Sequence, residues 1–116
     1  MPSVSDSTCS REYIKFPESP LSPRIPVVCR PPAEKAVNSD RINLNRCRLT
    51  VCPMLEGEEQ LRLLNLQHNS ITRLQHLSHL RRLVFLDLYN NLLQDMSGLE
   101  GLLSLRVLML GKNRYC

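Results

Sequence analysis

A period of 22 residues in the second half of the chain constrains its fold more than any other feature. Leu64, Leu86 and Leu108 are spaced by 22 residues, and Ile42 lies one period before them. Other apolar columns keep the same register: Leu44, Leu66, Leu88 and Leu110; Leu49, Ile71 and Leu93; Cys52, Leu74 and Met96; Leu55, Leu77 and Leu99; and Leu61, Leu83 and Leu105. One column is mainly polar and contains Cys47, Asn69, Asn91 and Asn113. A period kept by this many columns indicates stacked copies of one structural unit.

The two halves of each unit have different physical roles. Leu64 and Leu66 are two residues apart, so on a strand both side chains point to the same face, which we expect to be the interior. Asn69 then turns the chain, because its amide can hydrogen-bond backbone groups that a sheet would otherwise pair. We expect the stacked side chains of this column to form a structural ladder made of Cys47, Asn69, Asn91 and Asn113. Later apolar residues are three apart, which suits a short helical or 3-10 turn.

The repeated pattern L-x-x-L-x-L-x-x-N-x-L is similar to the leucine-rich-repeat signature. A single repeat of this kind cannot bury its own leucines, so neighbouring repeats must cover them. The resemblance implies an α/β fold, a leucine-rich-repeat solenoid of 22-residue repeats. A parallel sheet would line its concave face, and short helical or 3-10 turns would lie on its convex face.

The chain divides into a polar tail and a repeat domain. Residues 1–38 hold most of the prolines and no apolar period, so we predict a disordered Pro/Ser-rich tail. Residues 39–116 form the predicted repeat domain: a cap-like repeat at 39–60, repeats at 61–82 and 83–104, and a truncated repeat at 105–116. The cap-like repeat has Ser39, Cys47 and Glu58 where the pattern has Leu, Asn and Leu. We attribute these polar substitutions to a terminal repeat whose outer side meets water.

The outward positions of the predicted strands are candidates for partner binding. Exposed aromatic and apolar side chains in a row mark protein contacts, and the concave face is the usual binding surface of solenoids. The candidate partner-binding residues on the concave face are Leu63, Asn65, Phe85, Asp87, Tyr89, Val107 and Met109. The alternative is that these side chains merely pack along the sheet surface.

Neither a metal site nor a catalytic centre is indicated. The residues Cys47, Cys52, His68, His76 and His79 match no common zinc spacing, and nothing supplies an orienting group for a Cys/His pair. We therefore predict a non-catalytic protein without a cofactor. Ser19 and Ser22 each precede a proline and fit proline-directed phosphorylation, but an unmodified spacer is the simpler interpretation of this segment.

Composition and charge narrow the classes of partner and the compartment. The net charge of +4 is mild. The chain has few aromatic residues, two Phe, three Tyr and no Trp, whereas a typical nucleic-acid surface has more. A nucleic-acid-binding protein is therefore the less favoured alternative. The sequence shows no secretory signal and no apolar run long enough to cross a membrane. Five cysteines at irregular spacing do not suggest a disulfide framework. A reducing, cytoplasmic location is the simplest expectation.

Two segments carry a more specific resemblance. The 22-residue repeat resembles the short class found in phosphatase-regulatory and dynein-associated leucine-rich proteins. Within residues 40–114, the runs LTVCPMLEGE and LRLLNLQHN are not generic repeat text. They resemble the start of a family of non-catalytic leucine-rich-repeat subunits of the tubulin polyglutamylase complex.

This resemblance implies an interaction scaffold associated with microtubules and the cytoskeleton. Its partners would be proteins, namely other subunits of the polyglutamylase complex and tubulin, with neither nucleic acid nor membrane. Since the family continues through further repeats, the chain is expected to be an N-terminal fragment or a truncated isoform. The alternative is a generic leucine-rich-repeat adaptor that regulates a phosphatase or dynein.

Overall fold

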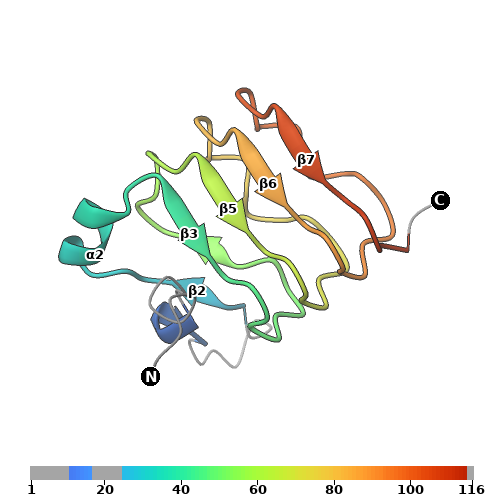
Figure 1. Cartoon of the computed structure of the whole chain (residues 1–116), viewed down its shortest axis with the longest axis horizontal. Helices are drawn as coiled ribbons and strands as arrows, with labels where there is room; N and C mark the ends of the chain where they lie inside the picture. Colours follow the sequence, from blue (N-terminus) through green and yellow to red (C-terminus); the bar gives the residue numbers. More distant parts are fainter. Residues whose placement is uncertain (1–10, 17–24, 115–116) are drawn as a thin grey trace, which may run out of the picture.

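Two small sheets organise the part of the chain that the computed structural model describes, residues 11–16 and 25–114. The elements, in chain order, are η1 (Arg11–Tyr13), β1 (Ile14–Lys15), β2 (Val27–Val28), α2 (Pro32–Val37), β3 (Arg41–Asn43), β4 (Met54–Leu55), β5 (Leu63–Asn65), β6 (Phe85–Asp87) and β7 (Val107–Met109). Figure 1 shows β3, β5, β6 and β7 side by side, with α2 and β2 next to β3.

The larger sheet has the order β3-β5-β6-β7, and every neighbouring pair in it is parallel. Ile42 pairs with Leu64, Leu64 with Leu86, and Leu86 with Leu108. Each step in this register is therefore 22 residues, the period of the sequence. Each repeat contributes one strand to this larger sheet, and the chain between two of its strands crosses behind the sheet.

The apolar columns of the sequence form the core. Leu64, Leu66, Leu86 and Leu88 have no exposed surface, because each lies between the leucines of the neighbouring repeats. The later half-repeats contribute Leu49, Ile71, Leu74, Leu77, Leu80 and Leu93 to the same cluster. Burial decreases toward β7, where Leu108 is only partly covered, since no described strand follows β7.

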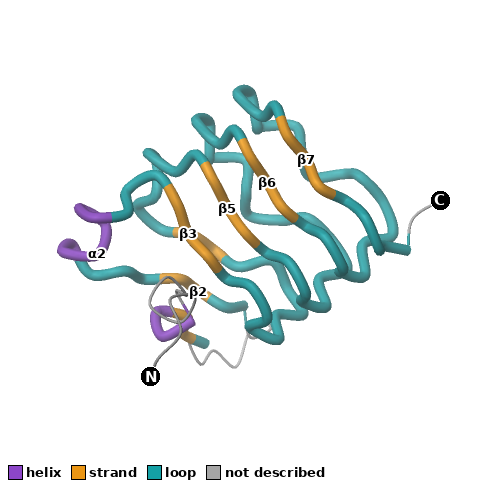
Figure 2. The backbone as a smooth tube through the Cα atoms, in the orientation of Figure 1, coloured by secondary structure: helices purple, strands orange, loops and turns teal. Residues whose placement is uncertain are grey.

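The second halves of repeats 61–82 and 83–104 were expected to form short helical or 3-10 turns, and they contain isolated turns. Leu80 N–H donates to Leu77 O at 2.9 Å, which closes one i→i+3 turn. The next amide, that of Arg81, donates to His79 O instead, so no second consecutive i→i+3 bond forms and no 3-10 helix propagates. The same sequence of bonds recurs one repeat later. Figure 2 shows loop in these segments of repeats 61–82 and 83–104, so the expected short helical or 3-10 turns are present there only as single i→i+3 turns.

The segment before the repeats is structured where it is described, which contradicts the prediction of a disordered tail for 11–16 and 25–38. β2 pairs antiparallel with β1 and parallel with β4, and β4 lies in the back half of the first repeat. Val28 of β2 has no exposed surface and belongs to the core. A strand of two residues has no detectable apolar period, which explains why the pattern alone missed it. The remainder of the predicted tail, 1–10 and 17–24, lies outside the described residues.

A buried ion pair joins this N-terminal segment to the first repeat. The Arg30 guanidinium donates to both carboxylate oxygens of Glu58, at 2.6 and 2.9 Å, and the two side chains are 0% and 2% exposed. Arg30 Nη1 also donates to the carbonyls of Asn38 and Arg41. The interpretation of Glu58 as a solvent-facing substitution is therefore wrong. Glu58 is polar because residues 25–38 cover this end of the core with a buried arginine.

Candidate functional site

The outward side chains of the parallel sheet form the first candidate surface. In each strand the middle residue points into the core, so the residues on either side of it face outward. Leu63 is 36% exposed, Val107 38% and Met109 43%, and Phe85 is half-buried between Leu63 and Val107. We call the row formed by Leu63, Phe85, Val107 and Met109 the outer sheet face. It is apolar and crosses three neighbouring strands.

Asn65 and Asp87 are also on these strands, but their side chains shape the backbone. Asn65 Oδ1 accepts from the Gln67 amide at 3.0 Å, and Asp87 Oδ1 accepts from the Tyr89 amide at 3.1 Å. The other Asp87 oxygen accepts a hydrogen bond from the Gln67 side chain. Asp87 is only 7% exposed, so the structure does not place it as the exposed contact that the sequence suggested. Asn43 makes the same turn one repeat earlier, which identifies a second structural column.

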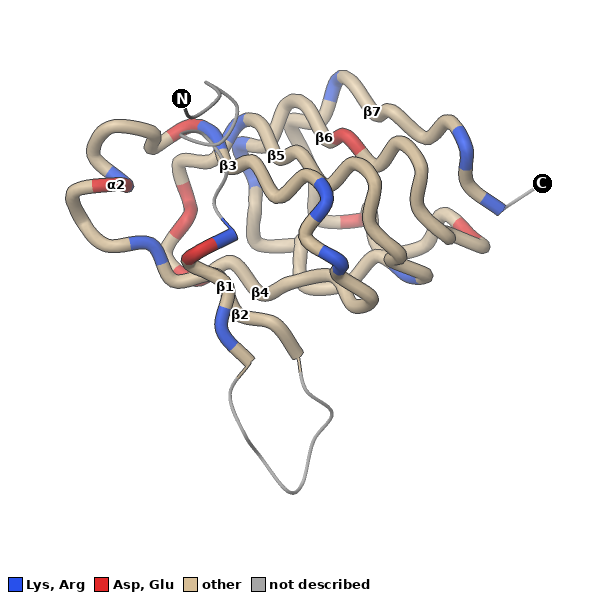
Figure 3. Tube along the Cα trace, turned by 60° about the horizontal axis from the view of Figure 1, so that its bottom comes forward, with Lys and Arg blue, Asp and Glu red and all other residues tan. Residues whose placement is uncertain are grey.

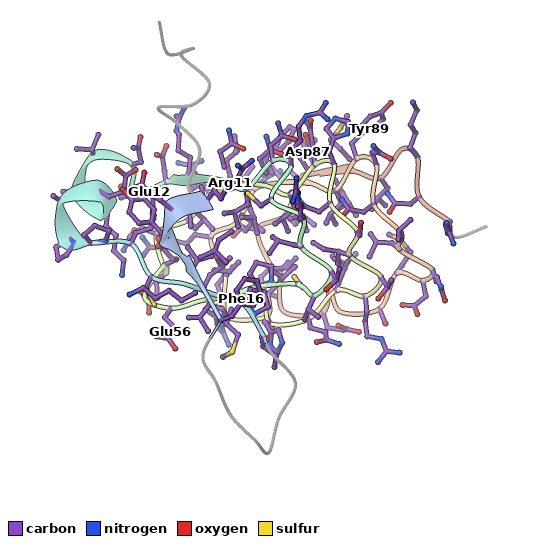
Figure 4. All side chains as sticks on the ribbon, turned by 90° about the horizontal axis from the view of Figure 1, so that it is seen from below. Arg11, Glu12, Phe16, Glu56, Asp87 and Tyr89 are labelled. Carbon is purple, nitrogen blue, oxygen red and sulfur yellow. The ribbon has the colours of Figure 1, made fainter. Side chains whose placement is uncertain are left out.

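Tyr89 lies just beyond the strand and is held by its neighbours. Its ring contacts His68 edge to face, with the centroids 5.8 Å apart, and Lys112 Nζ lies 5.9 Å from the ring centroid. A Cβ on Gly111 would come within 2.9 Å of the Tyr89 ring, so only glycine allows this close approach without a shift. Figure 4 shows Asp87 and Tyr89 on the opposite side of the molecule from Phe16 and Glu56.

The asparagine column satisfies backbone groups at the ends of the strands. Asn91 Nδ2 donates to Leu66 O in the previous repeat and to Leu88 O in its own, and Asn91 Oδ1 accepts from the Ile71 amide. Asn113 makes the corresponding bonds one repeat later. Asn69 accepts from the amides of Cys47 and Leu49. Each amide thus links two consecutive repeats.

Cys47 occupies the same column in the first repeat with a different set of bonds. Its thiol donates to Asn45 O at 3.5 Å, a distance suited to sulfur. A thiol has one weak donor where an amide has two good ones, so Cys47 cannot reproduce the set of hydrogen bonds that Asn69 makes. The N-terminal segment covers the first repeat instead.

The second candidate surface lies beside this ladder and was missed in the sequence. A cavity of about 800 Å³ is lined by Arg11, Arg46, Arg48, Thr50, His68 and Ser70, together with Cys47 and Asn69. We call this cavity the basic pocket. Arg11 Nη2 donates to Arg46 O at 3.0 Å, which holds the η1 arginine against the first repeat. The sequence placed Arg11 in the tail, so this contribution to the pocket had no detectable signal.

The described residues offer little for metal or thiol chemistry. No group of three or more His, Cys, Asp or Glu among them could hold a metal ion. Burial raises the pKa of the Cys52 thiol to about 12, so it is protonated at neutral pH and is a poor nucleophile. Cys52 belongs to the core cluster. In the same described part of the chain, no helix is long and apolar enough to span a membrane.

Comparisons with known proteins agree with the repeat pattern. Residues 59–101 match the family model for leucine-rich repeats in two copies. Leucine-rich repeat-containing protein 49 of Homo sapiens is 52% identical over 91 residues, which are 78% of this chain and 13% of that protein. Its Mus musculus counterpart is 59% identical over 63 residues, 54% of this chain and 9% of that protein. No solved structure matches the chain significantly.

The identity is high enough to make these proteins homologues, although the chain spans only a small part of their length. The matched repeats include β5 and β6, and with them Leu63 and Phe85 of the outer sheet face. The chain therefore contains leucine-rich repeats at residues 59–101, and its curated homologues carry the name Leucine-rich repeat-containing protein 49.

Proposed function

We propose that this chain is a non-catalytic scaffold that binds a protein partner through the outer sheet face. The observation that carries the proposal is the apolar row of Leu63, Phe85, Val107 and Met109 on the outside of a parallel sheet. Apolar side chains on adjacent strands form a continuous surface. The free energy falls when a binding partner removes such a surface from water. We further propose that the repeats form a solenoid and that this face is its concave side.

The proposed partner class rests on the family resemblance of the repeats. We propose that the chain acts with other subunits of the tubulin polyglutamylase complex and with tubulin or microtubules, and that it works in the cytoplasm on the cytoskeleton. The support is the resemblance of residues 40–114 to a family of non-catalytic subunits, together with the relatives' identity over 91 residues. A generic adaptor that regulates a phosphatase or dynein would use the same face but capture different proteins.

The test is a binding titration of purified polyglutamylase complex against the chain and two variants. Leu63→Ser with Val107→Ser removes two exposed anchors of the outer sheet face and leaves the inward leucines in place. Leu103→Ser is the matched control, because Leu103 is more exposed still and lies outside this face. Truncating one central apolar anchor typically costs about 2 kcal/mol, so the double variant, which truncates two anchors, should bind at least roughly 30-fold more weakly.

Three results separate the alternatives. Weaker binding of the double variant alone, at an unchanged unfolding midpoint, supports the outer sheet face as the interface. Equal binding by all three proteins would move the interface elsewhere. Failure of even the unsubstituted chain to bind the complex, combined with binding to a phosphatase or dynein, would favour the adaptor function.

A further inference from the structure

We propose that the basic pocket begins a cationic track along the ends of the strands, and that this track binds an extended acidic peptide. The pocket brings together Arg11 from η1 and Arg46 and Arg48 from the loop that follows β3. The proposal concerns a second surface, beside the outer sheet face, and does not depend on what that face binds.

The charge of the pocket is not neutralised within the described chain. No Asp or Glu lines the cavity, and none of its three arginines forms an ion pair with a carboxylate in residues 11–16 or 25–114. Glu12 follows Arg11 in sequence, but it lines a different cavity with Tyr13 and Lys15. Three unpaired guanidinium groups around one cavity repel one another, and an anion would relieve that repulsion.

Polar donors accompany these charges. Thr50 and Ser70 supply hydroxyl groups to the same cavity wall. His68 Nδ1 is 2.8 Å from the Asn90 side-chain nitrogen; if the Asn90 amide donates here, the ring N–H is on Nε2 and remains available as a donor. Charged and neutral donors together suit carboxylate oxygens, which accept several hydrogen bonds at once.

Polar side chains continue the row beyond the pocket at the same repeat position, with the cations Arg46 and Lys112 at its two ends. Arg46, His68, Asn90 and Lys112 are 22 residues apart, and all four have a left-handed backbone with φ between +54° and +60°. The amide of each of the first three donates to a carbonyl of the next repeat, namely those of Gln67, Tyr89 and Gly111. This shared conformation repeats the same loop on every unit. Figure 3 shows Lys and Arg around the N-terminal segment and again near the C-terminal end.

The geometry of this row favours an extended peptide over a single anion. Neighbouring strands are about 4.8 Å apart, so the three steps from Arg46 to Lys112 span about 14 Å. An extended chain rises about 3.3 Å per residue and would cover this distance in four to five residues. Cations at the two ends of this line, with the neutral donors His68 and Asn90 between them, suit carboxylates spaced along a peptide, whereas one phosphoryl group would reach only the pocket.

The same surface is a poor match for a nucleic acid. Single strands bind on aromatic platforms that stack against their bases. Tyr89 is the aromatic residue next to the row, and its ring already contacts His68 at its edge and Lys112 across its face. Since this ring is already in contact with His68 and Lys112, attraction between carboxylates and the cationic side chains is the interaction that this surface favours.

The experiment measures fluorescence anisotropy of a labelled octaglutamate peptide titrated with the full chain. Octaglutamine of equal length controls for the backbone, and a phosphoserine peptide and an oligonucleotide of equal charge test the other anions. The test variant is Arg46→Gln with Arg48→Gln, and the matched control is Arg81→Gln with Arg106→Gln. The control removes the same charge from exposed positions outside the pocket. Arg11→Gln provides a second test that leaves the repeats unaltered.

We expect octaglutamate to bind at low ionic strength and to weaken as salt is raised to about 0.15 M, where exposed charges are screened beyond about 8 Å. The pocket variants should bind roughly tenfold more weakly, which corresponds to the loss of charge-assisted hydrogen bonds, and the control less than about twofold. The proposal is overturned if octaglutamate binds no better than octaglutamine, if the control loses as much affinity as the pocket variants, or if the phosphopeptide or oligonucleotide binds more tightly than octaglutamate.

Discussion

Glu58→Leu tests whether the N-terminal segment is part of the fold. The repeats that follow carry Leu80 and Leu102 at the position of Glu58, so this substitution restores the leucine of the repeat pattern. From the sequence alone it should stabilise the protein. From the structure it should destabilise it, because it leaves the Arg30 guanidinium buried beside an apolar side chain.

The magnitude follows from the burial of the pair. With side chains 0% and 2% exposed, neither charge is reached by water, and removing one partner of such a pair typically costs about 3–5 kcal/mol. Replacing both partners, as Arg30→Met with Glu58→Leu, removes both charges and should be much less harmful. The double variant still loses the bonds from Arg30 to the carbonyls of Asn38 and Arg41, each worth about 1 kcal/mol. We expect it to lie within about 2 kcal/mol of the parent.

The assay is urea unfolding of the parent, the two single variants and the double variant, followed by far-UV circular dichroism. The expected result is a coupling free energy of at least about 2 kcal/mol, with Glu58→Leu less stable than the double variant. A Glu58→Leu protein as stable as the parent would refute the inference that this pair is buried and that residues 25–38 cover the first repeat.

Three further predictions concern the ladder, the core thiol and the N-terminal segment. Asn91→Ala should cost about 1–3 kcal/mol because it leaves buried backbone groups unpaired, whereas exposed Gln94→Ala should change the unfolding free energy by less than about 0.5 kcal/mol in the same urea titration. Burial raises the pKa of the Cys52 thiol from 9.0 to about 12, so its contribution to stability is complete below pH 9 and declines as pH rises toward 12. The native thiol should resist alkylation at pH 8 and react once urea unfolds the chain. Deleting residues 1–38 should lower the unfolding midpoint clearly, since it removes Val28 from the core, exposes the apolar side chains that residues 25–38 cover, and removes the ion pair between Arg30 and Glu58. An unchanged midpoint would restore the interpretation of this segment as a dispensable tail.

The period of the sequence predicted the repeats well because every repeat meets the same environment. Leu64 and Leu86 lie between equivalent neighbours, so the same side-chain size is required at each, and the requirement is visible as a column. The asparagines recur for a similar reason, since each loop leaves the same backbone groups to be paired. A row of outward side chains is also predictable from the alternation along each strand.

Features that join unlike parts of the chain left no such signal. β2 and β4 are two residues long each, and their pairing involves segments 27 residues apart that share no pattern. Arg11 reaches the basic pocket by a contact across 35 residues. The outward position of Asp87 was predictable, but its burial was not, because burial depends on the Gln67 side chain of the neighbouring repeat.

Departures from a repeat pattern in a first repeat therefore have two opposite physical explanations. A polar residue in an apolar column can face water because no neighbour covers it, or it can pair with a polar residue from a segment outside the repeats. Ser39 fits the first explanation, since it is exposed, and Glu58 fits the second. What distinguishes them is a buried partner of opposite charge, and such a partner needs an ordered backbone to hold it in place. Arg30 has that backbone because β2 precedes it and α2 follows it, so the short, patternless elements determine which polar residues of the first repeat are buried.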